Sequence, residues 1–216
     1  MAVLYSMPQH PAHLIGKRKH TMTAGTSVVT PERFETGIAS FSAWMETIPE
    51  RHKEFQRHYD EYTPDPADIA AVTGLVRQHG IKALLLGEHW CPDVWRGVPV
   101  LARIAEATGM EVRYFLRDQN KDIMGEFLNQ GEFESIPTVV FYDRDHRYLG
   151  HWIERPAVAN VEMEPLRKIL QAAPQEDGPE RQEALARYRE ATWQAAPGWR
   201  HASLKEMREL IEQAVR

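Results

Sequence analysis

The segment best suited to chemistry surrounds Cys91, the single cysteine of the 216-residue chain. It reads Gly87-Glu88-His89-Trp90-Cys91-Pro92-Asp93-Val94 and separates an apolar run from an amphipathic stretch. A cysteine at the start of a helix faces unpaired amides and the positive end of the helix dipole, which favour a thiolate. That position lowers a thiol pKa of about 8.5 by at most about 1.5. Asp93 opposes the thiolate by its charge, whereas a protonated His89 favours it, so we expect a moderately reactive thiol.

A second segment of interest is Ser135-Ile136-Pro137-Thr138, at the start of an apolar run. Proline cannot donate a hydrogen bond to a central ladder, so it needs a sheet edge or a special turn there. A cis peptide bond is found almost only before proline, usually in a tight turn. The segment therefore predicts a tight loop that leads into a strand.

The elements that must position these two segments alternate between strand and helix. The apolar patterns predict strands at 81–86, 112–116, 138–142 and 148–153, and helices at 94–105, 122–128 and 157–173. The polar turn at 143–146 joins the last two strands as a hairpin, and Pro165 is expected to kink the last helix. A parallel crossover followed by a hairpin predicts an α/β fold with a mixed sheet covered by helices.

Further helices are predicted on both sides of this central unit. Helical spacing of apolar residues runs from Phe34 to Met45, a polar helix is expected at 51–62, and another is bounded by Asp65 and Gly80. At the other end we predict two helices, 181–193 and one begun by a capping box at Ser203, separated by the break at 195–198. The expected organisation is a disordered leader at 1–29, a helical extension at 30–62, the α/β domain at 63–175 and a second helical extension at 176–216.

Together, Trp90-Cys91 at a strand-to-helix corner and Ile136-Pro137-Thr138 before a hairpin resemble the thioredoxin family. The resemblance covers about residues 65–175. The longer pattern is also similar to a bacterial thioredoxin-like subfamily with an N-terminal helical extension. Its matching pieces are Tyr62-Thr63-Pro64-Asp65, Trp90-Cys91-Pro92-Asp93, Val98-Pro99-Val100-Leu101, Arg117-Asp118, Ile136-Pro137 and Arg155-Pro156.

The resemblance assigns a role to each matching residue. Cys91 corresponds to the attacking cysteine, Pro137 to the cis-proline and Ile136 to the residue whose backbone can pair with a bound peptide. The expected substrate-binding residues are Trp90, Pro92, Asp93, Ile136 and Pro137, with His89 as a modulating residue. Two positions depart from the family pattern. The second cysteine is replaced by Val94, and the buried carboxylate six residues before Cys91 is replaced by Leu85.

Because the second cysteine and the buried carboxylate are absent, we expect chemistry that uses a single thiol. We expect a monothiol thiol–disulfide oxidoreductase of cell redox homeostasis, in which Cys91 forms a mixed disulfide with a protein or a low-molecular-weight thiol. The alternative is a redox-inactive binding module that recognises a peptide or a partner protein, with Cys91 as a small buried hydrophobe. A sulfenic-acid sensor and an iron–sulfur cluster shared between two chains remain open. The substrate, the source of the resolving thiol and the oligomeric state are not given by the sequence.

Composition and charge limit which other binding sites and cellular locations we expect. A net charge of −5 gives no reason to expect nucleic-acid binding, although a basic cluster lies at 17–19. The ten histidines lack paired ligand spacing, so we expect neither a metal site nor a cofactor. The longest apolar run is far too short to span a membrane. A single cysteine excludes an internal disulfide and is typical of a reducing compartment, most simply the cytoplasm.

Overall fold

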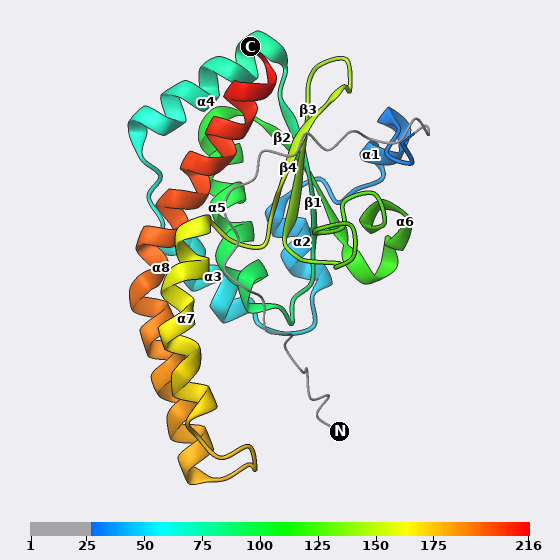
Figure 1. The fold of residues 1–216 in the computed structure, drawn as a ribbon. Helices are drawn as coiled ribbons and strands as arrows, with labels where there is room; N and C mark the ends of the chain where they lie inside the picture. The colour runs from blue at the N-terminus through cyan, green and yellow to red at the C-terminus, as the bar shows by residue number, and fades with distance from the viewer. Residues whose placement is uncertain (1–26) are drawn as a thin grey trace.

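The computed structural model describes residues 27–216, and a mixed sheet forms its centre (Figure 1). The strands are β1 (Lys82–Gly87), β2 (Glu111–Leu116), β3 (Thr138–Tyr142) and β4 (Tyr148–Ile153). They lie in the order β2-β1-β3-β4; β1 and β2 are parallel, whereas β3 is antiparallel to both β1 and β4. The predicted α/β fold class with a mixed sheet is confirmed.

Helices cover the sheet from two sides. They are α1 (Pro31–Glu35), α2 (Phe41–Thr47), α3 (His52–Asp60), α4 (Pro66–His79), α5 (Pro92–Thr108), α6 (Lys121–Met124), α7 (Ala157–Gln171) and α8 (Pro179–Ala214), with a 3₁₀ turn η1 at Arg117–Gln119. Figure 1 shows α4, α5, α7 and α8 on one side of the strands and α1 and α6 on the other. Because both faces are covered, the central strands β1 and β3 are buried along almost their whole length.

Helix α5 connects the sheet to the surrounding helices and carries Cys91 at its start. Its inner residues Val94, Val98 and Leu101 are fully buried, and the helix packs against α3, α4 and α8. Gly109 ends the helix in the left-handed conformation, as its position in the sequence predicts. These contacts on several sides fix the position of the first turn of α5 relative to β1.

The N-terminal helices are shorter than the apolar spacing predicts. Thr30 caps α1 by accepting a hydrogen bond from the N–H of Arg33, but α1 ends at Glu35. Ile38 then forms an isolated bridge with Tyr114 of the edge strand β2. Gly37 lies so close to Phe115 that a Cβ atom there would come within 2.5 Å of the ring. Pairing with the sheet edge therefore overrides the helical periodicity between residues 34 and 45.

The C-terminal prediction of two helices is wrong. Helix α8 runs without a break for 36 residues and passes through Pro197. The hydroxyl of Ser203 donates to the carbonyl oxygen of Trp199 at 2.9 Å, so it does not cap a new helix. A proline inside a helix costs about 3 kcal/mol. Burial of the following inner face, which includes Trp199, Leu204 and Met207, outweighs that cost.

The structure also bears on the predicted N-terminal leader and the predicted C-terminal extension. Most of the predicted leader, with its basic cluster, lies outside the described residues, whereas Val29 is buried at 2% exposure. Helix α8 packs on β4, α4, α5 and α7, so its C-terminal half lies on the sheet-bearing unit. Among the described residues, no helix is both long enough and apolar enough to cross a membrane.

Candidate functional site

Cys91 lies at the junction between β1 and α5, as predicted. It is the N-cap residue of α5, and its carbonyl oxygen accepts hydrogen bonds from the N–H groups of Val94 and Trp95 at 3.0 and 3.3 Å. Pro92 occupies the first turn, where no N–H donor is needed. The N–H of Cys91 donates to the carbonyl oxygen of Glu88 at 3.2 Å, which closes the loop after the strand. The residue as a whole is partly exposed.

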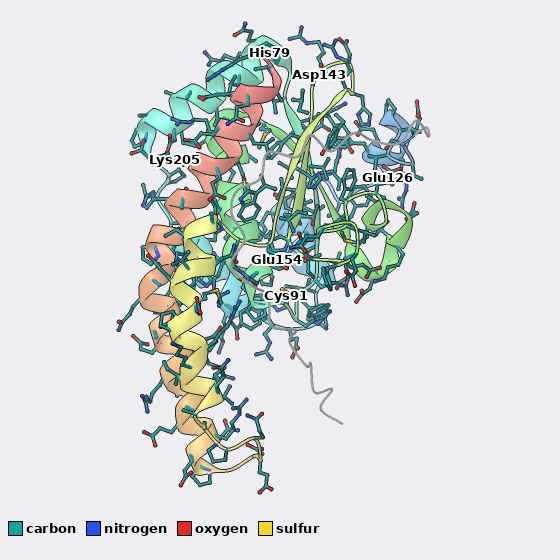
Figure 2. The ribbon with its side chains drawn as sticks, in the orientation of Figure 1. His79, Cys91, Glu126, Asp143, Glu154 and Lys205 are labelled. Atoms are coloured by element: carbon teal, nitrogen blue, oxygen red, sulfur yellow. The ribbon has the colours of Figure 1, made fainter. Side chains whose placement is uncertain are left out.

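The loop around Pro137 faces this sulfur. The Ile136–Pro137 peptide bond is cis, and the Cys91 thiol lies 3.6 Å from the carbonyl oxygen of Ile136, to which it can donate. Thr138 Oγ1 donates to the Ser135 carbonyl at 2.7 Å, and the N–H of Glu154 donates to the Pro137 carbonyl at 2.7 Å. The loop is thereby held from both sides. Figure 2 shows Cys91 and Glu154 in the same region of the molecule, in agreement with these contacts.

A glycine allows α5 to approach the proline closely. A Cβ atom at Gly97 would lie 3.0 Å from Cγ of Pro137 and 3.7 Å from the Trp152 ring. Residue 97 is one and a half turns into α5, on the same side of the helix as the site. The small residue therefore sets the distance between the helix and the Pro137 loop.

The pKa of the Cys91 thiol differs from the one that the sequence predicts. Burial raises the pKa of the Cys91 thiol to about 11, and the charge of Asp93 adds to the effect. Hydrogen bonds from the backbone of Val94 and Asp93, and the charge of Arg155, act in the opposite direction but are weaker. The expectation of a depressed pKa is therefore wrong, because the helix terminus contributes less than the loss of hydration.

Asp93 is held in a buried ion-pair cluster. Its Oδ1 accepts from Arg96 at 2.8 Å, and its Oδ2 accepts from Nε of Arg155 at 3.1 Å and from the Arg155 Nη2. The side chains of these three residues are between 11 and 17% exposed. A carboxylate at this depth needs such partners. The cluster joins the first turn of α5 to the corner between β4 and α7.

Trp90 forms the exposed flank of the site, with 39% of its surface accessible. The guanidinium of Arg117 lies over its ring, 5.1 Å from the centroid. Arg117 in turn forms ion pairs with Asp118 and Glu134. A cation on the indole face restrains the orientation of the ring.

The loop before Cys91 carries two further titratable residues. Glu88 is buried, and its Oε1 accepts from the N–H of Asp118 at 2.7 Å. Burial raises the pKa of its carboxyl group. The carbonyl oxygen of His89 accepts a hydrogen bond from the indole N–H of Trp95. A modulating role for the His89 imidazole remains a prediction.

The two departures from the dithiol pattern meet in an apolar setting. Val94 and Leu85 are both fully buried. Val94 occupies the position that a resolving thiol would take, one turn after Cys91. No buried carboxylate is therefore required beneath it, and both positions are apolar and fully buried.

The structure thus brings together the residues that sequence reasoning grouped, namely Trp90, Cys91, Pro92, Asp93, Ile136 and Pro137. Ile136 and Pro137 are buried and form the floor, whereas Trp90 is at the rim. Sequence reasoning missed Arg96 and Glu154 and gave Arg155 no electrostatic role. The spacing of Asp93 and Arg96 by three residues on one helix is a signal that could have identified Arg96. Within residues 27–216, no three His, Cys, Asp or Glu side chains come close enough to hold a metal ion.

Comparison with known proteins identifies the family of the chain. A family model described as thioredoxin matches residues 38–168, which is more than half of the chain. The predicted resemblance is confirmed by this match. No curated protein matches the chain.

Two solved structures share the fold. One is a protein of unknown function from Pseudomonas aeruginosa, with 20% identity, a TM-score of 0.55 and coverage of 84% of this chain and 95% of that one. The other is an HIV epitope-scaffold, with 19% identity, a TM-score of 0.58 and coverage of 88% of this chain and 99% of that one. At such identities the likeness concerns the fold alone.

Proposed function

Because the chain belongs to the thioredoxin family, we propose that it carries out thiol–disulfide exchange through Cys91 alone. One observation carries the proposal: the sulfur of Cys91, a partly exposed residue, lies 3.6 Å from the Ile136 carbonyl oxygen, beside the cis bond to Pro137. A nucleophile at the start of a helix, next to a backbone segment that can pair with an extended chain, suits attack on a polypeptide disulfide.

The proposed reaction has two steps. The Cys91 thiol loses its proton to solvent, and the thiolate attacks one sulfur of a substrate disulfide. A bond forms between Cys91 and that sulfur, while the other substrate sulfur leaves as a thiolate and takes up a proton. Because Val94 replaces the resolving cysteine, a thiol from another molecule must then attack the mixed disulfide. This thiol attacks the substrate sulfur of the mixed disulfide, so a disulfide forms between that sulfur and the external thiol, and Cys91 leaves as a thiolate and takes up a proton. One disulfide is thus exchanged for another, and a second equivalent of the external thiol completes the two-electron reduction of the substrate.

The raised pKa limits the rate of the first step. A pKa of about 11 leaves about one thiol in 10⁴ ionised at pH 7. The rarer thiolate is more nucleophilic, with a Brønsted coefficient of about 0.4–0.5. Together, the two effects make Cys91 roughly 20- to 30-fold slower than an ordinary cysteine toward the same disulfide. The proposed enzyme therefore depends on substrate binding, rather than on a highly activated thiol.

The raised pKa of the Cys91 thiol also favours a second candidate, a thioredoxin-fold binding module without redox chemistry. A mostly protonated thiol near the buried apolar side chains of Val94 and Leu85 is typical of a packing residue. In this account Trp90 and the backbone near Ile136 recognise a peptide, and Cys91 only fills space. Partners of either candidate are polypeptides or small thiols, in a reducing compartment such as the cytoplasm.

Disulfide trapping distinguishes the two candidates. The native reduced protein is mixed with a peptide that contains one disulfide and, separately, with oxidised glutathione, and intact mass is followed with time. The exchange proposal predicts a mixed disulfide at Cys91 in the native state, released by added thiol. The Cys91→Ser variant is the blank, because the chain has no other cysteine. A native protein that forms no adduct, but does so in urea, would support the binding module.

A further inference from the structure

We propose that Arg155 is a positioning residue for Cys91: through Asp93 it holds the first turn of α5 against the Pro137 loop and offsets the repulsion between the Asp93 carboxylate and the Cys91 thiolate. The meaning of this role for catalysis rests on the proposed function. The geometry and its effect on the reactivity of the thiol do not rest on it, because the rate of reaction with any thiol-specific electrophile measures that effect.

Asp93 is the link between the two residues. It lies two positions after Cys91, in the first turn of α5, and is 9% exposed. Both of its carboxylate oxygens are occupied, one by Arg96 from the same helix and one by Arg155 from a segment 62 residues away. Arg96 can hold the carboxylate within α5, but only Arg155 ties it to another element.

Arg155 comes from the corner that also supports the proline loop. Its N–H donates to the Ile153 carbonyl at 2.9 Å, and its Nη1 donates to Asn160 Oδ1 of α7 at 3.1 Å. The preceding residue, Glu154, has a φ of +63° and donates its N–H to the Pro137 carbonyl at 2.7 Å. A non-glycine residue in the left-handed region is uncommon. One corner thus contacts both walls of the site, the Pro137 loop directly and α5 through Asp93.

Two charged side chains act on the Cys91 thiol, Asp93 from α5 and Arg155 from the β4–α7 corner. Arg96 contacts Asp93 from the same helix, and Glu154 pairs with Arg155 at the corner. Glu88 and His89 lie in the loop before α5. Asp93 raises the pKa of the thiol, whereas Arg155 lowers it. An unpaired carboxylate this close to the sulfur would oppose ionisation strongly, since like charges in a poorly hydrated site interact with little screening. The guanidinium of Arg155 partly neutralises the Asp93 carboxylate and so reduces its repulsion of the thiolate.

The test measures the rate of Cys91 alkylation by iodoacetamide in the native protein at pH 8.5. Arg155→Gln is expected to raise the thiol pKa further, because it removes a guanidinium charge that lowers it. Less thiolate is then present and the rate falls, by up to about threefold, since the greater nucleophilicity of the less acidic thiolate offsets part of the loss. Arg155→Lys keeps the charge and should restore most of the rate. Asp93→Asn should act in the opposite direction and accelerate alkylation about threefold.

The double variant tests whether Arg155 acts through Asp93. In the Asp93→Asn background, Arg155→Gln should cost less than it does in the parent. Arg208→Gln is the matched control, because Arg208 forms a 2.6 Å ion pair with Asp68 at comparable burial, between α8 and α4. It should lower the melting temperature without changing the alkylation rate.

Three results would overturn the proposal. They are an unchanged rate in a folded Arg155→Gln variant, equal rate changes in Arg155→Gln and Arg208→Gln, and slower alkylation of Asp93→Asn. Should Arg155→Gln fail to fold, the rates of Asp93→Asn and Arg155→Lys decide the matter alone. Failure of the proposed function is distinguished by disulfide trapping, because the alkylation pattern holds even where no mixed disulfide forms.

Discussion

The buried side chains of His58 and Arg200 form a hydrogen bond of 2.9 Å between Nδ1 of the imidazole and Nη1 of the guanidinium. Arginine is always a donor, so the imidazole accepts and must be neutral. Burial, together with the charges of Arg200, Arg96 and Arg57, lowers the pKa of His58 to about 3. The pair joins α3 to α8 and requires an unprotonated histidine in the native state.

This pair predicts a specific loss of stability in acid. The unfolded chain protonates His58 below about pH 6.5, whereas the native protein resists protonation down to about pH 3. The free energy of unfolding therefore falls between these values, by up to about 1.4 kcal/mol per pH unit from this residue. His58→Asn keeps an acceptor but does not titrate, so it should flatten the fall. Urea unfolding at pH 5 and 7 measures the difference, with His79→Asn as the control. The same pH slope in His58→Asn and the parent would contradict this account.

Gly97 is expected to be intolerant of even one added carbon atom. A methyl group at this position meets Pro137 at 3.0 Å, so Gly97→Ala must push α5 away from the loop. Overpacking of this kind costs about 1–3 kcal/mol. Gly74→Ala is the control, since a methyl group there meets nothing within 4 Å and should stabilise α4 by about 0.5–1 kcal/mol. Thermal unfolding compares the two. Equal effects would mean that the approach of α5 to Pro137 is not tight.

Pro197 should be replaceable with a gain in stability. It lies within the continuous helix α8 and cannot donate an N–H to the carbonyl of Trp193. Pro197→Ala restores that hydrogen bond and should raise the free energy of unfolding by about 1–3 kcal/mol. Urea unfolding at neutral pH provides the measurement. A loss of stability would indicate that α8 is broken at this point, as the sequence pattern alone suggests.

Restoring a second thiol should change the chemistry of the site. Val94 lies one turn after Cys91 on α5, and Val94→Cys places a thiol at the spacing of a Cys-x-x-Cys pair. We expect mild oxidation to form an internal disulfide, and we expect reduction of a peptide disulfide to proceed without an external resolving thiol. Thiol titration and peptide mass follow the two reactions. Val98→Cys, one further turn along the buried face, is the control, and equal reactivity of both variants would contradict the role assigned to position 94.

Local signals predict many element boundaries correctly. Asp65 caps its helix, Gly80 ends it, and the hairpin strands occupy the predicted residues. These features depend on contacts within a few residues. The grouping of Cys91 with Pro137 also came from sequence, but through the family resemblance rather than from local chemistry.

Features set by distant contacts were not predictable in this way. The continuity of α8 through Pro197 depends on the burial of its C-terminal half against the core. The elevated thiol pKa depends on how much water the folded chain removes around Cys91, which no local pattern records. The bond from Asp93 to Arg155 spans 62 residues and follows only from the three-dimensional fold.

The pH dependence of Cys91 alkylation in the native protein tests most directly whether the fold presents a usable nucleophile. The account predicts a measurable but slow reaction at pH 8, with a rate that rises with pH toward a midpoint near 11. Urea-unfolded protein should react faster at pH 8, and Cys91→Ser should not react at all. A native thiol that stays unmodified at every pH until denaturant is added would contradict the proposal, and Cys91 would then be a packing residue.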